Sequence, residues 1–414
     1  MPPRLLLALL LWATAAHAQP LPRQPQAVRA WLERLAARHP HMTRLVTLGR
    51  SHEGRPIVAL VLGRGAHAGP LPGPAVLLDG AHHGGELLSI DFVLDAAREL
   101  LEHRDQDPTL ARALEELAIW CVPMVNPDGV HAYLQGLPRS GRKNGRDNDG
   151  DGKRGRGDGV DLNRNYPLGW GSLGERGSRS LPASYWYRGP APASEPETQA
   201  IIRLARQEHF VAAIAYHTGT VAVLAPYTIE SLPSPEPNEA WMVAEDIVAH
   251  MPLHPEGRPF TLRNRLYSVD GTAEDYLRHA HGTVSLLVEG ARRPAVGLRA
   301  REAVIGAVRP SWRRLLERYL EGPSLEGQVV DAAGQPAVAE VTLAEQQLLA
   351  GEHWTSRCRD GRFFRFLPGP GRYTIRARVP GLPEVTQTVE VPSGRGRVKL
   401  TLPQALPRRD CPGL

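Results

Sequence analysis

The sequence predicts an α/β domain, in which helices flank a central sheet, followed by a small all-β sandwich. Between residues 28 and 321, short apolar runs with strand character alternate with segments in which apolar residues recur every three or four positions, as on one face of a helix. From Leu325 onward, short alternating segments are separated by Gly and Pro turns. This change of pattern predicts a small β-sandwich that begins near Gly322-Pro323.

Strands and helices are expected to alternate along the first 321 residues. Strands are predicted over residues 45–48, 55–62, 75–78, 117–125, 210–216 and 284–288. Helices are predicted over residues 28–37, 89–103, 197–207, 240–250, 272–278 and 301–321. Asn126-Pro127-Asp128-Gly129 has the composition of a turn. Residues 135–195 form a long irregular stretch, which in a compact domain indicates a functional loop.

The first 18 residues have the pattern of a secretory signal peptide. A short charged start is followed by an apolar run, Leu5 to Ala15, and by Ala16-His17-Ala18 before Gln19. The apolar run is too short to span a bilayer, and no later segment is long and apolar enough to do so. We therefore expect cleavage after Ala18 and a chain that is secreted or periplasmic, without a membrane span.

Charge and cysteine content limit the partners and the compartment. The formal net charge is +5, but the basic residues are scattered and are nearly all Arg, with Lys only at positions 143, 153 and 399. Scattered charge makes no phosphate-binding face, so no nucleic-acid partner is expected. Cys121 lies in an apolar strand and is expected to be a buried thiol, whereas Cys358 and Cys411 could pair in an oxidising compartment.

A candidate metal site lies between the third predicted strand and the helix that follows it. His83 and Glu86 stand on a tight turn with glycines between them. An imidazole and a carboxylate held in this way can bind a divalent cation, and zinc suits this mixture of ligands. His83, Asn126, His217 and Glu289 all stand at the ends of predicted buried strands. Because ligands gather at the carboxyl ends of strands in α/β sheets, we expect these side chains to converge.

A series of motifs between residues 45 and 295 occurs in the order typical of one protein family. The motifs are Gly80-Ala81-His82-His83-Gly84-Gly85-Glu86, Val125-Asn126-Pro127-Asp128-Gly129, Arg142-Lys143-Asn144, Gly159-Val160-Asp161-Leu162-Asn163-Arg164-Asn165-Tyr166-Pro167, Tyr187-Arg188-Gly189, Ser194-Glu195-Pro196-Glu197-Thr198, Tyr216-His217, Leu266-Tyr267 and Val288-Glu289. By these motifs the sequence resembles the zinc metallocarboxypeptidases of peptidase family M14, the carboxypeptidase A/B and D/N/M superfamily. The resemblance implies a mixed central sheet flanked by helices and one Zn²⁺ per chain.

The resemblance implies that His83, Glu86 and His217 are the zinc ligands. Two imidazoles and one carboxylate leave a fourth position for a water, whose pKa the metal lowers toward neutrality. His82 has no counterpart in the family pattern, and we expect it to be a partly exposed turn residue.

The same resemblance assigns the groups that act on the reacting bond. Glu289 would be the general base that takes a proton from the water and delivers it to the leaving amine. Arg142, which the run Arg142-Lys143-Asn144 distinguishes from other arginines of its loop, would stabilise the oxyanion. Asp161 would accept the free N–H of His83 and fix the orientation of that ring.

Four further residues would bind the substrate. Asn163 and Arg164 would hold its terminal carboxylate, for which a guanidinium offers a matching fork. Tyr267 would close over the bound peptide. Glu274 falls near the position that sets the side-chain preference, where a carboxylate suggests C-terminal Arg or Lys. A solvent-facing helix glutamate is the alternative interpretation of Glu274.

An acidic loop departs from the family pattern. Asp147, Asp149 and Asp151 alternate with Asn and Gly, which resembles a calcium-binding loop. The loop lacks the Glu that would close such a site, although Asp158 could substitute for it. Calcium binding and a solvated acidic turn are left as alternatives.

The sequence therefore predicts four segments and one function. The segments are a signal peptide (1–18), a zinc carboxypeptidase catalytic domain (19–322), a domain resembling the transthyretin-like regulatory β-sandwich (323–403) and a tail (404–414). The predicted function is hydrolysis of the C-terminal bond of peptides or proteins with a free C-terminus. The alternatives are a cell-wall (murein) peptide hydrolase on the same fold and a non-catalytic peptide-binding homologue. The oligomeric state is left open.

Overall fold

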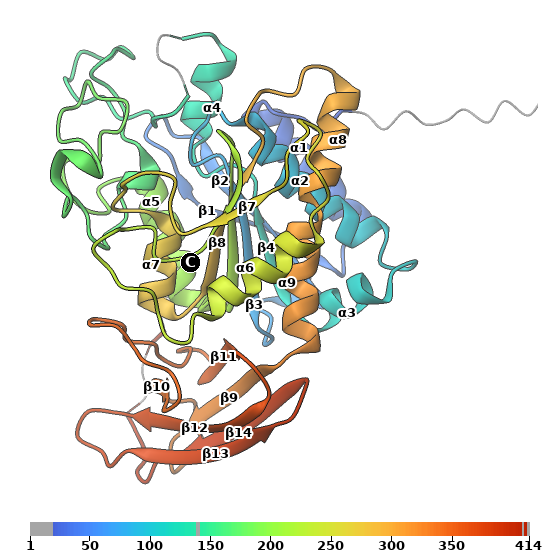
Figure 1. Ribbon diagram of the computed structural model, residues 1–414, viewed down its shortest axis with the longest axis vertical. Coiled ribbons are helices and arrows are strands. Elements are labelled where there is room, and N and C mark those ends of the chain that lie inside the picture. The colour runs from blue at the N-terminus through green and yellow to red at the C-terminus, as the bar shows by residue number, and fades with distance from the viewer. Residues whose placement is uncertain (1–19, 138–140, 408–409, 412–414) are drawn as a thin grey trace, which may run out of the picture.

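The computed structural model describes residues 20–137, 141–407 and 410–411. It consists of a large α/β domain and, after Gly322, two small sheets that lie beneath it in Figure 1. The predicted signal peptide, residues 1–18, lies outside the described residues. The boundaries proposed for the domains stay predictions.

An eight-stranded mixed sheet forms the centre of the large domain, with the strand order β1-β2-β4-β3-β5-β8-β6-β7. The strands are β1 (Thr43–Arg50), β2 (Pro56–Leu62), β3 (Ala75–Gly80), β4 (Ala118–Val122), β5 (Ala212–His217), β6 (Val221–Leu224), β7 (Thr261–Arg263) and β8 (Val284–Gly290). The four central strands β4, β3, β5 and β8 run parallel, so their carboxyl ends share one edge of the sheet. β2 and β6 pair antiparallel with the two outer members of this group.

Helices cover both faces of this sheet. They are α1 (Pro25–Arg38), α2 (Leu87–Glu102), α3 (Pro108–Glu116), α4 (Pro127–Leu134), α5 (Pro196–Glu208), α6 (Glu239–His250), α7 (Ala273–His281), α8 (Leu298–Val308) and α9 (Pro310–Glu321). Along β3, Val76 and Leu78 join a core with α1, α2, α3, α6, α8 and α9, whereas Leu77 joins the core with α5 and α7. Successive residues of a strand point to opposite faces of the sheet, and helices cover both faces. Both sets of side chains on the central strands are therefore apolar. Each fully buried Leu or Val contributes about 1.5–3 kcal/mol to this packing.

The predicted fold class is confirmed, and several elements differ in detail. The helix predicted over residues 301–321 is divided into α8 and α9 at Arg309, because Pro310 has no N–H to continue the ladder. The turn predicted at residues 126–129 is instead the start of α4, where the Asn126 side chain accepts a hydrogen bond from the Gly129 N–H at 2.8 Å. Helix α3 and the short strands β6 and β7 were not predicted.

The C-terminal part is a pair of three-stranded sheets around one apolar core. The sheets have the orders β10-β12-β13 and β11-β9-β14. Their strands are β9 (Ser324–Val330), β10 (Glu340–Leu343), β11 (Arg362–Phe366), β12 (Gly371–Arg378), β13 (Val385–Val391) and β14 (Arg395–Thr401). The pair β9 with β14 is parallel, and the other pairs are antiparallel.

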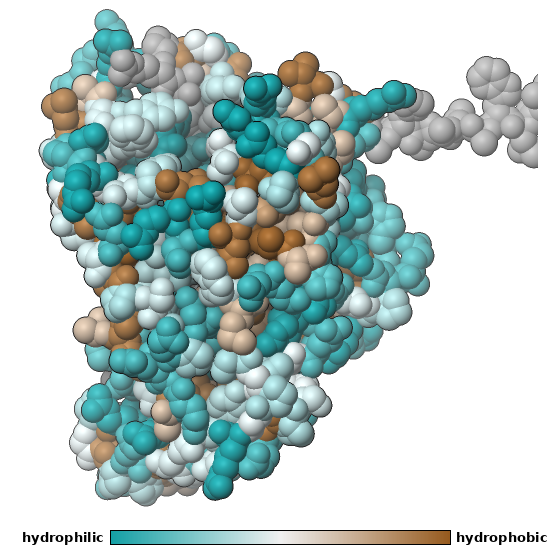
Figure 2. Space-filling model, viewed as in Figure 1, coloured by the Kyte–Doolittle hydropathy of each residue, from teal (hydrophilic) through white to brown (hydrophobic). Residues whose placement is uncertain are grey.

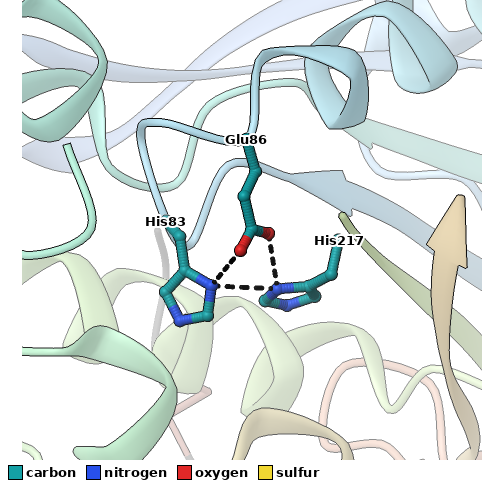
Figure 3. A group of neighbouring side chains, drawn as sticks. All are labelled: His83, Glu86 and His217. Atoms are coloured by element: carbon teal, nitrogen blue, oxygen red, sulfur yellow. Dashed lines mark hydrogen bonds and ion pairs between the residues drawn. The ribbon is translucent and has the colours of Figure 1, made fainter. Parts of the chain in front are cut away.

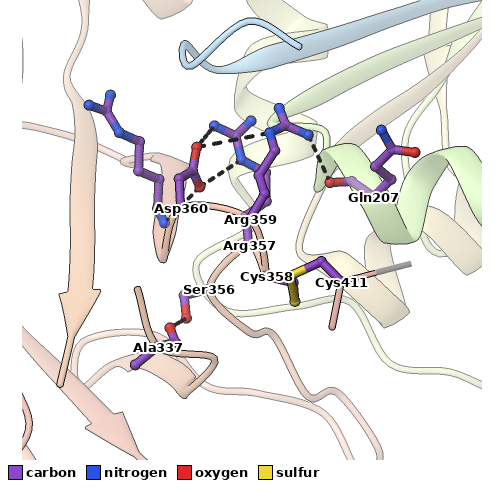
Figure 4. Close-up of a disulfide and its surroundings, with 9 residues drawn as sticks. Gln207, Ala337, Ser356, Arg357, Cys358, Arg359, Asp360 and Cys411 are labelled. Carbon is purple, nitrogen blue, oxygen red and sulfur yellow. Dashed lines mark hydrogen bonds and ion pairs between the residues drawn. A yellow bond between two sulfur atoms is a disulfide. The ribbon is translucent and has the colours of Figure 1, made fainter. Parts of the chain in front are cut away.

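The C-terminal sheets dock on the amino ends of the parallel strands, the edge opposite their carboxyl ends (Figure 1). Arg357 donates to the Pro72 carbonyl at 2.7 Å, just before β3, and Arg359 forms two 2.8 Å hydrogen bonds with Glu208, just before β5. Between these arginines, Cys358 forms a disulfide with Cys411 (Figure 4). A buried arginine that binds a carbonyl and a half-buried arginine that binds a carboxylate make this a specific interface. Cys121 is a buried free thiol, as predicted.

The face shown in Figure 2 is mostly hydrophilic, with apolar residues in separate groups. Across the described ranges, none of the helices combines the length and apolar character that crossing a bilayer requires.

Candidate metal centre and active site

The turn after β3 places His83 and Glu86 at the carboxyl edge of the sheet. β3 ends at Gly80, and Glu86 is the residue before the first turn of α2. Gly84 lies directly against α4, because a Cβ at this position would stand 2.1 Å from the backbone of Gly129. A side chain cannot fit there, so the glycine allows the turn to reach its position.

Three side chains meet above this edge. Glu86 Oε1 lies 2.9 Å from His83 Nδ1, and Glu86 Oε2 lies 3.0 Å from His217 Nδ1, which comes from the last residue of β5. The two Nδ1 atoms are 3.2 Å apart (Figure 3). His83 and His217 are buried, and Figure 3 shows that the three polar ends point into one small space.

This donor set fits a divalent cation. Two imidazole nitrogens and a carboxylate are the ligands that zinc takes in catalytic sites that keep a position for water. Nitrogen lone pairs that face each other at 3.2 Å repel unless a proton or a cation lies between them. The ionised state of the carboxylate is the one a cation needs: although burial opposes ionisation, the two histidines lower the pKa of Glu86 far below its usual value.

Asp161 and Arg142 form a second layer around His83. Asp161 Oδ1 lies 3.1 Å from His83 Nε2, and Asp161 Oδ2 accepts a 2.8 Å hydrogen bond from Arg142 Nε. Burial opposes ionisation of Asp161, but the Arg142 guanidinium and the His83 ring hold its pKa well below the usual range. The ionised Asp161 therefore orients both the ring of His83 and the guanidinium of Arg142, whose Nη1 lies 3.4 Å from His83 Nδ1.

Asn126 and Asn144 hold the segment that carries Arg142. The Asn126 amide donates to the Arg142 carbonyl at 3.2 Å, so this residue at the start of α4 positions a loop and does not face the cluster. Asn144 accepts a 2.8 Å hydrogen bond from the Val160 N–H, one residue before Asp161. The two loops that supply Arg142 and Asp161 are thus fixed to each other.

Glu289 lies beside the cluster because β8 pairs with β5. His217 and Glu289 are partners in that pairing, and the Thr220 N–H donates to Glu289 Oε2 at 3.4 Å. Burial, with the neighbouring Glu86 carboxylate, raises the pKa of Glu289 to about 8. A carboxylate whose pKa is raised this far can both accept and release a proton near neutral pH.

One pocket joins Glu289, His83 and His217 to the predicted substrate-binding residues. Its other lining residues are Asn163, Arg164, Leu224, Thr228, Arg265, Leu266, Tyr267, Val269, Thr272, Glu274 and Leu287. Arg164 Nη2 lies 3.3 Å from the Tyr267 hydroxyl, and within the described structure the buried Arg164 Nε has no hydrogen-bond partner. A buried guanidinium with an unpartnered donor fits an anionic ligand.

Glu274 lines this pocket and is buried, with 2% of its surface exposed. The alternative of a solvent-facing helix glutamate is therefore wrong. Burial, with the adjacent Asp275 carboxylate, raises the pKa of Glu274 to about 7. Asp275 itself does not line the pocket, because its carboxylate accepts hydrogen bonds from the N–H groups of Thr228 and Ile229 at 2.8 and 3.0 Å.

Two residues near the site differ from what the sequence indicated: the expectation for His82 is wrong, and Tyr185 was not predicted to take part. His82 is fully buried and not partly exposed, with Nε2 3.0 Å from the Tyr166 hydroxyl and Nδ1 3.1 Å from Asp79. Tyr185, which the sequence did not single out, lies with its ring 5.1 Å from the Arg142 guanidinium. Only the fold brings Tyr185 to Arg142, because the two are far apart along an irregular segment.

The acidic loop brings its four carboxylates together in a turn. The carboxylates of Asp147, Asp149, Asp151 and Asp158 lie close together. They accept hydrogen bonds from the loop itself, including the Gly150 N–H to Asp147 at 2.7 Å. Side-chain oxygens that bind their own backbone amides are typical of Asx turns, so the calcium prediction is not supported.

Comparison with known proteins decides the family. The family model described as zinc carboxypeptidase matches residues 28–311. The chain belongs to the zinc carboxypeptidase family. Carboxypeptidase N catalytic chain from Mus musculus is 28% identical over 416 residues, covering 90% of this chain and 85% of that protein. Carboxypeptidase Z from Homo sapiens is 28% identical over 401 residues, covering 89% of this chain and 58% of that protein.

Solved structures show the same fold. Bovine thrombin-activatable fibrinolysis inhibitor, in complex with tick carboxypeptidase inhibitor, matches with a TM-score of 0.60 and 22% identity, covering 71% of this chain and 96% of that chain. Carboxypeptidase A from Helicoverpa armigera matches with a TM-score of 0.59 and 22% identity, covering 70% of this chain and 71% of that chain. The chain spans a little over half the length of the carboxypeptidase Z relatives. The predicted resemblance and fold class are thereby confirmed.

Proposed function

We propose that this zinc carboxypeptidase family member is an exported enzyme that removes C-terminal residues from peptides and proteins. The observation that carries the proposal is the meeting of His83, Glu86, His217 and Glu289, from three different strand ends, at one edge of the sheet beside a pocket. In the proposed site, the first three residues hold one Zn²⁺. When bound, this ion polarises the scissile carbonyl and lowers the pKa of a water.

The chain's own residues orient the substrate and move the proton. Arg164, with Asn163, binds the terminal carboxylate, and Tyr267 closes over the peptide from its half-exposed position above Arg164. Glu289 takes a proton from the attacking water and gives it to the amine that leaves. A divalent cation beside Glu289 favours its ionised form, which is the form a base needs.

Arg142 supplies fixed positive charge for the oxygen on which negative charge develops. Its guanidinium cannot turn freely, because Asp161 holds both Nε and Nη2 and the peptide carbonyl of Arg142 is bound to Asn126. A donor fixed in advance stabilises the transition state without the cost of reorganisation.

We further propose that the enzyme prefers Arg or Lys at the C-terminus of its substrate. Glu274 is the acidic residue of the pocket that does not also bind the metal or act as the base, and it lies among the apolar side chains of Leu224, Val269 and Leu287. A cationic side chain that enters the pocket would ionise Glu274 and pair with it away from water.

One assay tests both proposals. Purified protein is incubated with matched peptides that end in Arg, Lys, Phe or Ala, with and without a chelator, and the C-terminal products are sequenced. Loss of single C-terminal residues that stops with the chelator supports the carboxypeptidase. Equal or faster release of Phe overturns the basic preference. If the protein released residues only from a murein stem peptide, the cell-wall alternative would be favoured. If the unmodified protein cleaved no peptide, a non-catalytic binding protein would be favoured.

A further inference from the structure

Helix α7 connects the side-chain pocket to the C-terminal sheets. At its first turn, the Ala273 N–H donates to Asn163 Oδ1 at 2.8 Å, and Glu274 lines the pocket. At its other end, the indole of Trp354 packs against Gly282, where a Cβ would lie 2.6 Å from the ring. One nine-residue helix therefore spans the distance between the pocket and the edge on which the C-terminal sheets dock.

A loop of the catalytic domain makes the same connection. Thr228 lines the pocket and is held to Asp275 of α7, through its N–H at 2.8 Å and its hydroxyl at 2.9 Å. The residue before it, Tyr227, is buried and donates a short hydrogen bond from its hydroxyl to Glu352 Oε1. The pocket wall at Thr228 is therefore bound on one side to α7 and on the other, through Tyr227, to Glu352.

Glu352 belongs to the C-terminal sheets, in the segment between β10 and β11. It is buried, and its second oxygen accepts a 2.7 Å hydrogen bond from the Leu349 N–H. Arg278 of α7 lies 3.9 Å from Glu352 and is paired with Glu239 at 3.1 Å, and its guanidinium stacks 4.7 Å from the Trp354 ring. A buried carboxylate is costly unless it is bound in this way, so Glu352 holds Tyr227 and α7 in one arrangement.

We propose that the C-terminal sheets are a positioning element for the side-chain pocket, and that they act through Glu352. The expected effect on KM rests on the proposed function. The coupling between Glu352 and the pocket is a property of the fold and does not depend on catalysis. Glu352 touches no substrate. It fixes the Tyr227–Ile229 loop and α7, and these two segments fix Thr228 and Glu274 at the pocket. The metal ligands stand on β5 and on the turn after β3, so the positioning acts on substrate binding and not on the proton transfer.

The test is Glu352→Gln in the full chain, with Glu208→Gln as the matched control. Both changes remove one buried carboxylate that crosses the interface, but the side-chain hydrogen bonds that the described structure gives Glu208 go to Arg359 at the base of β5 and not to α7. Tyr227→Phe removes the same hydrogen bond from the catalytic side and serves if Glu352→Gln folds poorly. Zinc content is measured for every variant.

Two measurements are made on each variant. Hydrogen exchange over residues 226–229 and 272–277 reads the coupling without any substrate. Steady-state kinetics on the best peptide substrate reads its consequence. For Glu352→Gln we expect faster exchange in both segments, a KM that rises roughly 2- to 30-fold, and a kcat within about twofold of the original. The double variant with Tyr227→Phe is expected to be no worse than either single change.

Two results would overturn the inference. One is unchanged exchange in both segments for Glu352→Gln and Tyr227→Phe. The other is an equal change in exchange or in KM for Glu208→Gln, since that would mean only that the interface was loosened. If the unmodified chain hydrolyses no peptide, the proposed function fails, and the exchange data still decide whether Glu352 positions the pocket.

Discussion

Replacement of Glu274 by Gln should move stability and activity in opposite directions. The pKa of Glu274 is raised to about 7 from an ordinary value of 4.5, chiefly by burial. The folded state therefore binds this proton more tightly than the unfolded state does, so the free energy of unfolding falls as the pH rises from about 4.5 to about 7. A shift of this size corresponds to about 3 kcal/mol, and the full cost is present above pH 7.

The variant removes that cost and also removes the partner of a cationic substrate side chain. At pH 8, Glu274→Gln should be more stable by about 3 kcal/mol, and below pH 4.5 its stability should equal that of the original chain. A hydrogen bond to a charged group contributes about 1.5–3 kcal/mol. The kcat/KM for peptides ending in Arg or Lys should therefore fall about 10- to 150-fold, with little change for peptides ending in Phe.

Denaturant unfolding at pH 4.5 and at pH 8 measures the stability difference. Steady-state kinetics on the matched peptides measures kcat/KM. Glu274→Asp is the control, because it keeps the charge but shortens its reach. Lower stability of Glu274→Gln at pH 8, or an equal loss of activity on basic and apolar substrates, would contradict the role of Glu274 in binding the substrate. Either result would mean that Glu274 supports the structure of α7 and does not select the substrate.

Three other predictions follow from the same geometry. Glu289→Gln should lower kcat about 10²- to 10⁴-fold without loss of zinc, and metal analysis beside single-turnover kinetics checks this; full activity would remove Glu289 as the base. Asp161→Asn should weaken zinc binding about 10- to 100-fold, measured by competition with a chelator, and unchanged affinity would contradict its role in orienting His83. His281 is buried and the half-buried His209 beside it faces the C-terminal sheets, where its Nδ1 lies 3.0 Å from the Thr355 carbonyl; desolvation lowers their pKa values to about 3 and about 4. The folded state therefore binds fewer protons at these two sites, and their contribution to stability should fall as the pH drops from 6.5 to about 4, opposite in sign to that of Glu274. It is measured as the difference in stability between the original chain and a variant with both histidines changed to Gln; a difference that stays constant across that window would contradict it.

The repeated pattern of apolar strands followed by amphipathic helices made much of the fold predictable. Both signals are local, and the strand ends fixed where His83, His217 and Glu289 would meet, since parallel strands bring their carboxyl ends to one edge. Short strands such as β6 and β7 have too few residues for a period to be visible.

Contacts that depend on tertiary packing were not predictable from the sequence. The burial of His82 follows from Tyr166 and Asp79, which meet it only in the fold. The contact of Glu352 with Tyr227 joins residues that are 125 positions apart, one after β6 and the other between β10 and β11. No periodicity or motif marks such a pair, because each residue alone has the appearance of an ordinary loop residue.

The central claim is that His83, Glu86 and His217 hold one cation that Glu289 needs for catalysis. The most direct measurement is the metal content of the purified chain, taken together with C-terminal release from a peptide pool before and after chelation. We expect one zinc per chain, its loss in Glu86→Gln and His217→Ala, and peptide hydrolysis that disappears with the metal and returns when zinc is added. Stoichiometric zinc in His217→Ala, or hydrolysis that persists in the metal-free chain, would contradict it.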